Sequence, residues 1–428
     1  MVHVSPENTE FAIVSFEGPD EYSRAGGLAV RVRDLAETLA ALGFRTHLFF
    51  IGDPGLPAVE TDGRLTLHRW GQWISAYHPG GVYDGEWNKM QDLSSSLPPV
   101  LANEIVRQAA SIGRRTVVMG EDWQTVDTMI NTAQAVAGAG LSGRCIPVWT
   151  ANNVFGFDNI DWPVLTSAAQ PMTVSRYMKH EMWRYGINPL VAPNGVAPAA
   201  IIDVPPGDTQ SLRAAFGGDI ALFKIGRFTG DKGWHPALES VAILKSWGVR
   251  ARILIRGDRS SYGQEVLSRA RDLGLSVSDL ASRFESVEEL ADGISIHTEA
   301  DVLNLTSFLP DSLVPPIYAA VDGVLANSGH EPFGLVGLEV MGAGGLAFVG
   351  STGEEYAVAD SNAVVLDTGD PREIVVQLLR LRDDPDTATR LKHSAKETAR
   401  SWIWPKVVPE LLAKLEYVAL ARGMEKPE

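Results

Sequence analysis

The sequence predicts an α/β protein made of two doubly wound domains that face each other across a cleft. Three observations predict this class. Short apolar runs alternate with segments of helical spacing, this alternating series occurs twice, and a stretch rich in Pro and Gly at 192–208 separates the two series. Alternating strands and helices are typical of a parallel sheet that is covered by helices on both faces.

The composition fits this class and restricts the partners. A chain of 428 residues is too long for one hydrophobic core, so two or three domains are expected. Its 45% hydrophobic and 21% charged residues are those of an ordinary globular protein. The formal net charge of −16 argues against nucleic acid or an anionic membrane surface as a partner, because both attract clustered Lys and Arg.

Cysteine usage and the N-terminus indicate the compartment. Cys145 is the single cysteine, which excludes an internal disulfide and a cysteine-based metal cage, and we expect it to be a small buried apolar residue. The N-terminus lacks a basic segment followed by a long apolar core, and no apolar run approaches the length that spans a bilayer. We therefore expect a cytoplasmic protein with no integral membrane segment; its oligomeric state is not readable from the sequence.

The first alternating series predicts an N-terminal domain over residues 1–200. It opens with the apolar run 11–16, followed by a loop and by apolar residues at helical spacing over 28–42. The strand-like run 45–52 completes a strand, turn, helix and strand. Further strands of this domain are expected at 116–119, 146–150 and 171–174.

The second series predicts a C-terminal domain over residues 201–398. Six apolar runs in it have the length of buried strands, and each precedes a candidate helix or turn. They lie at 221–227, 252–257, 302–309, 323–328, 345–350 and 363–367. In such sheets a ligand binds at the carboxyl ends of the strands, where helix N-termini offer free N–H groups to phosphate.

The turn after the first strand, "SRAGGL", is the first candidate for an anion site. Gly26 and Gly27 let the backbone approach a bulky anion, and Arg24 can supply positive charge. The alternative is a helix entry that only needs flexible residues. No G-x-G-x-x-G motif is present here to support a nicotinamide dinucleotide site.

The turn "KIGRFTGDKGW" is the second candidate. Arg227 follows an apolar strand, and Lys232 comes five residues later. Two cations at one strand end can clamp a diphosphate and neutralise it as a leaving group. The alternative is a pair of solvated surface bases, and the spacing alone leaves both interpretations open.

The stretch "SGHEPFGLVGLEVMGAGG" contains two carboxylates in an apolar, glycine-rich run. We expect a helix to begin at Pro332 and to continue through Met341, which places Glu339 about 12 Å along and roughly 80° around from Glu331. That separation is too large for two carboxylates that flank one bond, so a paired acid and base of the hydrolase type is disfavoured. We expect the two acids to bind different parts of one extended ligand.

These residues resemble a known family. The "EPFGLVGLEVMGAGG" segment resembles the Glu, seven residues, Glu signature of the retaining nucleotide-sugar glycosyltransferases of group 1, which have the GT-B fold. "GRFTGDKG" is similar to their phosphate turn, and "PNGV" at 193–196 to the Asn-Gly-Val that closes their first domain. The resemblance covers nearly the whole chain and implies two Rossmann-like domains around a central cleft.

The N-terminal half has features similar to glycogen and starch synthases. "SRAGGL" resembles their Lys-x-Gly-Gly-Leu loop, with Arg24 in place of the lysine and with Glu17 preceding it. "GEDWQT" resembles their His-Asp-Trp-Gln segment, with Glu121 in place of the histidine. The end of the chain, 399–428, resembles the family's closing helix, which packs back on the N-terminal domain.

The resemblance implies a role for each matching residue. Arg227 and Lys232 would hold the donor diphosphate, and Glu331 would bind hydroxyls of the transferred sugar. Glu339 would accept hydrogen bonds from the ribose. Donor contacts are also implied for Arg24, Gly26, Gly27, Asn152, Phe333, Gly334 and Leu335. Asn152 stands where relatives carry a histidine; it can hydrogen-bond a sugar hydroxyl but cannot carry a proton.

The implied activity is that of a retaining hexosyltransferase. It would move a hexosyl group, with glucosyl as the first expectation, from an ADP-, UDP- or GDP-sugar to a hydroxyl of a saccharide or small polyol. Neither a metal nor a cofactor is expected, since positioning and charge stabilisation would carry catalysis. A non-catalytic protein that binds sugar nucleotides, an epimerase and a phosphorylase with pyridoxal phosphate remain as alternatives.

The acceptor is expected to contact an aromatic segment at 68–88. This segment is predicted to be loop-like and contains Trp73, Tyr77 and Tyr83. Aromatic rings stack on the C–H faces of sugars, which suggests a saccharide-like acceptor. The alternative is that the rings pack the loop onto its own domain.

Overall fold

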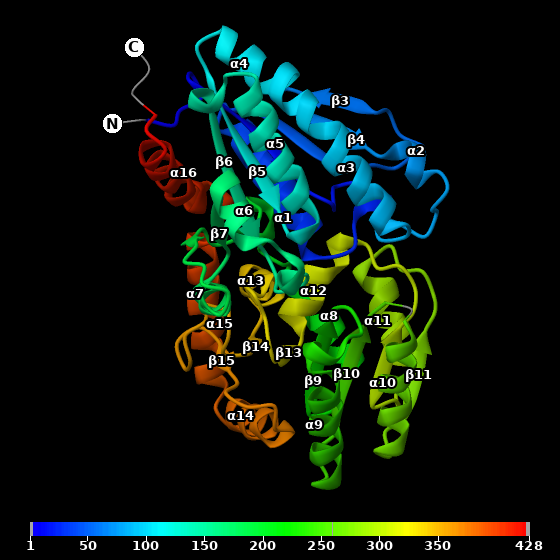
Figure 1. The fold of residues 1–428 in the computed structure, drawn as a ribbon. Coiled ribbons are helices and arrows are strands. Elements are labelled where there is room, and N and C mark those ends of the chain that lie inside the picture. Colours follow the sequence, from blue (N-terminus) through cyan, green and yellow to red (C-terminus); the bar gives the residue numbers. More distant parts are fainter. Residues whose placement is uncertain (1–2, 259, 425–428) are drawn as a thin grey trace. The chain divides into compact units, whose positions relative to one another are not determined.

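The computed structural model describes residues 3–258 and 260–424, and the chain divides into two units (Figure 1). Unit 1 consists of Met1–Gly195 and Trp404–Glu428, and unit 2 of Val196–Ile403. The boundaries thus follow residues 195 and 403, where the sequence suggested 200 and 398. Val196 and Ile403 pair in an isolated β-bridge, so the chain enters and leaves unit 2 at the same point.

Unit 1 contains a sheet of eight strands in the order β3-β4-β2-β1-β5-β6-β7-β8. All neighbouring strands are parallel except β3, which is antiparallel to β4. The strands are β1 (Thr9–Val14), β2 (Arg45–Ile51), β3 (Val59–Asp62), β4 (Leu65–Trp70), β5 (Arg115–Glu121), β6 (Cys145–Ala151), β7 (Gln170–Thr173) and β8 (Leu190–Val191). Strands β1, β5 and β6 are buried throughout, which explains their nearly continuous apolar sequences.

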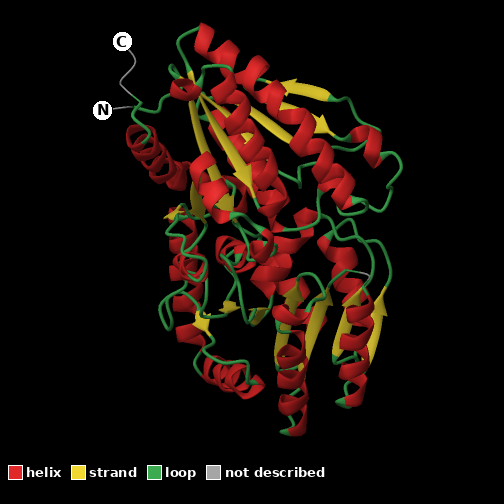
Figure 2. Cartoon of the chain, viewed as in Figure 1, coloured by secondary structure: helices red, strands yellow, loops and turns green. Residues whose placement is uncertain are grey.

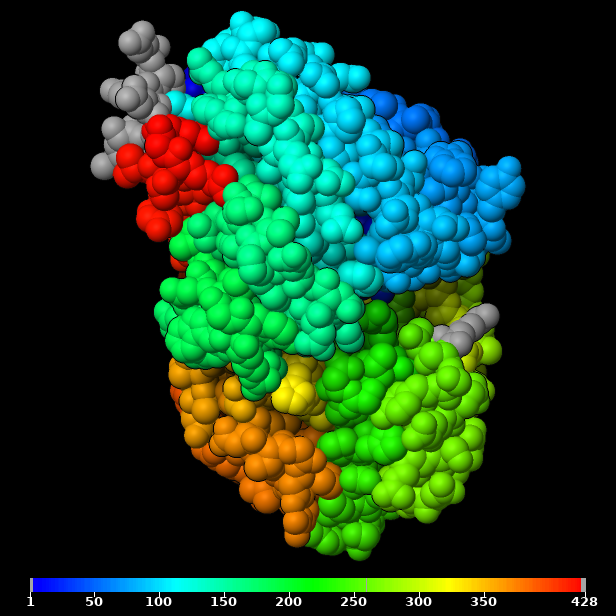
Figure 3. Space-filling view, in the orientation of Figure 1, coloured from blue at the N-terminus to red at the C-terminus, as the bar shows by residue number. Residues whose placement is uncertain are grey.

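The helices of unit 1 cover this sheet (Figure 2). They are α1 (Gly27–Ala41), α2 (Gln72–Ser75), α3 (Glu86–Val100), α4 (Arg107–Ser111), α5 (Val126–Gly138), α6 (Trp162–Ala168), α7 (Arg176–Trp183) and α16 (Trp404–Ala421). Helix α3 packs on α5. Helix α16, red in Figures 1 and 3, contacts α1 and β6, and its Trp404, Leu411 and Leu415 are buried in the same core cluster as Val32 and Leu35 of α1.

Unit 2 contains a sheet of seven parallel strands in the order β11-β12-β10-β9-β13-β14-β15. The strands are β9 (Ile220–Ile225), β10 (Ala251–Arg256), β11 (Val277–Leu280), β12 (Val302–Leu305), β13 (Gly323–Ala326), β14 (Ala347–Val349) and β15 (Val364–Val365). Alternate residues of the strands, such as Leu222 and Ile253, are buried against α9 and α14. This alternation is the pleat of a sheet that has helices on its faces.

The helices of unit 2 form two packed groups. They are α8 (Pro206–Phe216), α9 (Trp234–Ser246), α10 (Ser261–Asp272), α11 (Val287–Ile296), α12 (Val314–Ala320), α13 (Leu335–Gly342), α14 (Pro371–Asp383) and α15 (Pro385–Ser401). Helix α9 packs on α10 and α14, whereas α8 packs on α11 and α12. Helix α13, which carries Glu339, packs on α15 and on its own strand β14.

Two features differ from the sequence-based expectation. The segment 68–88 is not a loop: it contains the end of β4, the short helix α2 and the start of α3. Strands β3, β4, β8 and β11 were not predicted. The sequences of β3 and β11, "VETD" and "VSDL", are too polar to give an apolar run. Cys145 is buried in β6, as expected. None of the helices in the described part of the chain has the length and apolar character of a bilayer-spanning helix.

Candidate functional site

The centre of the unit 2 sheet is the first place where a ligand is expected. Strand β9 pairs with β10 on one side and with β13 on the other, so the order of the strands reverses between β9 and β13. Doubly wound sheets bind ligands at this reversal, outside the carboxyl ends of the strands. The loops that follow β9 and β13 carry the predicted Arg227, Lys232 and Glu331.

Lys232 and Glu331 form an ion pair across this point. The Lys232 Nζ lies 2.7 Å from Oε2 of Glu331 and 3.5 Å from Oδ2 of Asp231. The side chains of Lys232 and Glu331 are 25% and 20% exposed, so the pair is partly shielded from water but open to a ligand. Arg227 is exposed on the same loop, and its backbone carbonyl accepts a hydrogen bond from the Trp234 indole at 2.9 Å.

A buried lysine lies beneath this ion pair. Lys224 of β9 is 2% exposed, and its Nζ donates hydrogen bonds to the Leu325 carbonyl at 2.8 Å and to Asn327 Oδ1 at 2.6 Å. The pKa of Lys224 is lowered to about 7; burial is the main cause, the charge of Lys232 contributes, and Glu331 opposes the shift. Lys224 had no predicted role, although its place inside an apolar strand was an available signal.

Glycine is required where the two loops meet. Gly233 has a φ of +64° and ends the turn before α9. A Cβ at this position would lie 2.2 Å from the Asn327 carbonyl oxygen. Gly329 N–H also donates to the Asp231 carbonyl at 2.9 Å. The close approach of these backbones places the Lys232 and Glu331 side chains within reach of each other.

The helix after β13 is shorter than the sequence analysis predicted. It begins at Leu335, because Gly334 adopts a φ of +81° and ends the irregular segment before it. Glu331 therefore lies in the preceding loop, and the estimate of 12 Å and 80° for two residues on one helix is wrong. The Glu331 N–H donates to Thr352 Oγ1 at 2.9 Å, which fixes the loop. Phe333 is buried, with its ring 5.7 Å from that of Tyr356, so only its backbone is suited to contact a ligand.

Glu339 is the predicted ribose-binding residue, and it lies on α13 in a partly buried position. The Tyr318 hydroxyl lies 3.5 Å from its Oε2. Burial raises the pKa of Tyr318, and the Glu339 carboxylate adds to that rise. The structure thus places Arg227, Lys232, Glu331 and Glu339 in one unit, with the first three on two adjoining loops.

Glu354 is a residue that the sequence analysis missed. It is 5% exposed, and its Oε2 accepts hydrogen bonds from the N–H and the hydroxyl of Thr352 at 3.2 and 3.3 Å. Its Oε1 is buried without a hydrogen-bond partner among the described residues. Burial raises the pKa of Glu354 to about 7, and the Glu331 carboxylate adds to the rise. The available signal was the acid pair in "TGEEYA", in the turn that follows the predicted strand 345–350.

In unit 1 the strand order reverses between β1 and β5. Glu17 lies just after the carboxyl end of β1, and Glu121 is the last residue of β5. Glu17 Oε2 accepts hydrogen bonds from the backbone N–H groups of Ala25, Gly26 and Ala29 at 3.3, 2.9 and 3.2 Å. The N–H of Gly26 is therefore already bonded to a carboxylate, and an anion there must compete with Glu17. Gly27 begins α1, and both Gly27 and Arg24 are exposed.

Asn152 is tied into a buried polar cluster at the end of β5. Its Nδ2 donates to Glu121 Oε2 at 2.8 Å, and its Oδ1 is buried without a partner among the described residues. Arg31 Nε donates to the same Glu121 oxygen at 3.0 Å. Asp122 has a φ of +66°, and its Oδ1 accepts the Asn152 N–H at 3.0 Å. Burial raises the pKa of Asp122 to about 7, and Glu121 and Glu17 add to the rise.

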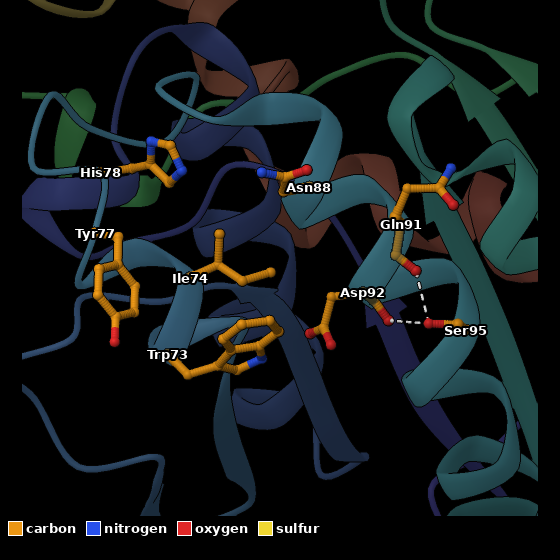
Figure 4. A pocket seen from close by; sticks show the side chains of 8 residues that line it. All are labelled: Trp73, Ile74, Tyr77, His78, Asn88, Gln91, Asp92 and Ser95. Carbon is orange, nitrogen blue, oxygen red and sulfur yellow. Dashed lines mark hydrogen bonds between the residues drawn. The ribbon is translucent and has the colours of Figure 1, made fainter.

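The predicted acceptor residues do not all lie in one place. Trp73 and Tyr77 line a pocket of about 530 Å³ between α2 and α3 (Figure 4). Tyr83 lines a different pocket together with Arg24, and its hydroxyl donates to Glu17 Oε1 at 2.5 Å. Tyr83 therefore connects the aromatic segment with the glycine turn, whereas Trp73 and Tyr77 remain available to a ligand.

Comparison with known proteins assigns the second unit. Residues 212–398 match the family model of "Glycosyl transferases group 1". Unit 2 contains a group 1 glycosyl transferase domain. The Lys232 and Glu331 pair, Glu339 and Glu354 all lie within this group 1 domain.

Two curated proteins are similar to part of the chain. A D-inositol 3-phosphate glycosyltransferase of Thermomonospora curvata is 32% identical over 133 residues, which are 31% of this chain and 30% of that protein. A lipopolysaccharide core biosynthesis glycosyltransferase of Rhizobium meliloti is 29% identical over 128 residues, or 29% of this chain and 36% of that protein. The matched segments thus span about a third of each curated relative.

Solved structures share the fold over nearly the full length. A sucrose-phosphate synthase from Thermosynechococcus elongatus has a TM-score of 0.67 at 15% identity and covers 97% of this chain and 100% of its own. The catalytic domain of starch synthase IV from Arabidopsis thaliana, bound to ADP and acarbose, has a TM-score of 0.71 at 13% identity with the same coverage. The two Rossmann-like units therefore form a GT-B fold.

Proposed function

We propose that this protein is a retaining glycosyltransferase that moves a hexosyl group from a nucleotide diphosphate sugar to a hydroxyl acceptor. The observation that carries the proposal is the Lys232 and Glu331 pair at the strand reversal of the group 1 domain. A cation and a carboxylate that lie 2.7 Å apart offer a partner for phosphate and a partner for sugar hydroxyls within one ligand.

The side chains around the pair suit the parts of a donor. Arg227 and Lys232 can neutralise the charge that develops on the leaving diphosphate, which is an electrostatic contribution to catalysis. Glu331 would orient the transferred sugar, and Glu339 would accept hydrogen bonds from the ribose. Gly334 and Leu335 begin α13, whose N-terminal N–H groups favour a phosphate oxygen.

Retention of configuration follows if the acceptor attacks on the face of the sugar from which the phosphate leaves, and this step requires no protein nucleophile. The family resemblance implies that the leaving phosphate takes the proton of the acceptor hydroxyl on the same face of the sugar. The residues of this chain would then hold donor and acceptor in position and stabilise charge, which can supply most of the rate enhancement. Metal independence belongs to the same proposal: Lys232 and Arg227 would provide the charge that a metal provides elsewhere.

A panel of ADP-, UDP- and GDP-sugars tests this function. The released nucleoside diphosphate is measured with and without a mixture of saccharides and polyols, and the anomeric configuration of the product is read by NMR. We expect one donor to be consumed faster in the presence of an acceptor, with retention. Inversion at the anomeric carbon contradicts the retaining mechanism, and failure to consume any donor contradicts the proposed activity.

A binding protein without turnover is the second candidate, and one observation favours it. The Gly26 N–H is bonded to Glu17, and Asn152, which replaces the family's histidine, is bonded to Glu121. Both groups are thereby less available to a donor. Tight binding of a nucleotide sugar with no release of nucleotide under any condition of the panel would identify this function.

A further inference from the structure

The pocket between α2 and α3 has two chemically different walls (Figure 4). The side chains of Trp73, Ile74 and Tyr77 form the wall on and just after α2. Trp73 is 67% exposed and Tyr77 is 80% exposed, so little of either ring is used to stabilise the fold. Large rings that are left in water beside a concave surface favour a ligand with an apolar face.

The opposite wall is polar and belongs to α3. The Asp92 carboxylate points toward Trp73, and Asn88 and Gln91 also line the pocket, which adds amide donors and acceptors to the carboxylate acceptor. Burial raises the pKa of Asp92, and interactions with the side chains of Trp73 and Ser96 oppose that rise. A ring with hydroxyl groups at its edge and C–H groups on its face satisfies both walls at once.

The charge of the pocket restricts the ligand further. The eight described residues that line the pocket include Asp92 but no lysine or arginine. Lys89 lies on the same helix, but it is fully buried, and its Nζ donates to the carbonyls of Gly81, Val82 and Asp84 at 3.0, 3.0 and 2.6 Å. His78 also lines the pocket, but its Nδ1 is already paired with Asp84 Oδ1 at 3.2 Å. A phosphate group in this pocket would therefore meet a carboxylate and neither a lysine nor an arginine.

We propose that the pocket lined by Trp73, Tyr77, Asn88 and Asp92 binds an uncharged saccharide and selects against phosphorylated sugars. This inference rests on the proposed function in one respect, since it gives the pocket the role of the acceptor site. The sugar ring stacks on Trp73, and its hydroxyls donate to Asp92 and hydrogen-bond with Asn88. The pocket volume of about 530 Å³ lies within the range of small-molecule sites.

Binding is measured with the full chain and without any nucleotide sugar, by isothermal titration calorimetry and saturation-transfer NMR. The neutral probes are maltotriose, cellotriose and sucrose, and the anionic probes are glucose 6-phosphate and fructose 6-phosphate. We expect at least one neutral probe to bind, with saturation transfer to its C–H protons. Glucose 6-phosphate should bind at least about tenfold more weakly than that probe.

Substitutions locate the binding to this pocket. Trp73→Ala should weaken the binding of the neutral probe about tenfold, because stacking on the ring is lost. Asp92→Asn keeps the shape of the side chain but removes its charge. It should weaken the binding of the neutral probe and reduce the difference in affinity between that probe and glucose 6-phosphate. Trp247→Ala is the matched control, since Trp247 is 58% exposed at the end of α9 and lines neither pocket described in unit 1.

The outcomes separate this inference from the proposed function. Loss of neutral-probe binding in Trp73→Ala, with Trp247→Ala unchanged, supports the pocket even if no donor is ever consumed. Three results would each overturn the proposed saccharide site, even in a protein that turns over a donor. They are that no probe binds, that Trp73→Ala leaves the binding of the neutral probe unchanged, or that sugar phosphates bind as tightly as neutral sugars.

Discussion

Lys232 and Glu331 are separated by 99 residues in the chain, yet Nζ and Oε2 lie 2.7 Å apart. Each belongs to a loop that follows one of two adjacent central strands, β9 and β13. The ion pair therefore links the two strand ends at which the order of the sheet reverses. The ion pair orients both side chains in the absence of ligand. A bound diphosphate would compete with Glu331 for Lys232.

A double-mutant cycle on this pair tests whether the two residues act together. Lys232→Met and Glu331→Gln should each lower kcat about 100- to 1,000-fold, because each removes a charge-assisted contact worth about 3 to 4 kcal/mol in the transition state. The double variant should lose less than the sum of the two single effects, since the two side chains contact each other. Effects on the activation free energy that add to within about 0.5 kcal/mol would show that the residues act independently.

Glu339 and Arg227 should affect different kinetic constants. Glu339→Ala should weaken the binding of the donor, because the ribose contact exists in both the ground state and the transition state. Arg227→Ala should mainly lower turnover, because the charge on the leaving diphosphate grows during the reaction. Calorimetric Kd and steady-state kcat for both variants check this division. An Arg227 variant that loses donor affinity and keeps its kcat would contradict the role given to Arg227.

Gly233→Ala should destabilise unit 2 by about 2 kcal/mol or more in urea denaturation. The added Cβ would lie 2.2 Å from the Asn327 carbonyl oxygen, and the φ of +64° is strained for alanine. Gly248→Ala is the control, because Gly248 has a φ of +77° with no atom within 4 Å of the added Cβ. Equal losses of stability in the two variants would mean that the contact with Asn327 has no energetic consequence.

The pKa of Glu354 predicts a dependence of stability on pH. Burial raises this pKa from 4.5 to about 7, so between these values the folded state binds more protons than the unfolded state. The contribution of Glu354 to the free energy of unfolding is therefore full below about pH 4.5 and falls as the pH rises to about 7. The loss amounts to roughly 3 kcal/mol.

Glu354→Gln removes this titration. The stability of the variant relative to the wild type should therefore increase when the pH is raised from 5 to 8. Thermal unfolding of both proteins at pH 5 and at pH 8 measures this difference. Asp122 also has a pKa raised to about 7 by burial, but it is unchanged in both proteins and cancels in the comparison. A difference between variant and wild type that stays constant from pH 5 to pH 8 would show that Glu354 titrates near its ordinary pKa.

The fold class was predictable because its signal is repeated along the chain. Buried parallel strands such as β1, β5 and β9 are continuous apolar runs, and each is followed by a turn that is rich in polar residues and glycine. The edge strands β3, β8 and β11 gave no such signal, whereas the edge strand β15 lies within the predicted run 363–367. Strand β3, "VETD", is fully exposed, and its pairing with β4 depends on backbone hydrogen bonds that any sequence can make.

The site was predictable only where residues follow a strand directly. Arg227 and Lys232 follow β9, so their position at the centre of the sheet could be inferred from the alternation of elements. The start of α13 could not be inferred in this way, because the sequence is compatible both with a helix that begins at Pro332 and with a turn that ends at Gly334. In the structure Gly334 has a φ of +81°, so the helix begins after it. Contacts between loops that are distant in the sequence, such as the Glu331 N–H with Thr352 Oγ1, depend on packing that no local pattern records.

The most direct test of the central claim compares two lysines that both form ion pairs in unit 2. Lys232 pairs with Glu331 at 2.7 Å, and Lys245, which lies on α9, pairs with Asp301 at 2.8 Å. The measurement is the initial rate of nucleoside diphosphate release from the best nucleotide sugar. If Lys232 neutralises the leaving diphosphate, Lys232→Ala lowers this rate at least about 100-fold, and Lys245→Ala stays within about twofold of the wild type. Equal rates for the two variants, or no release by the wild type from any donor, would contradict it.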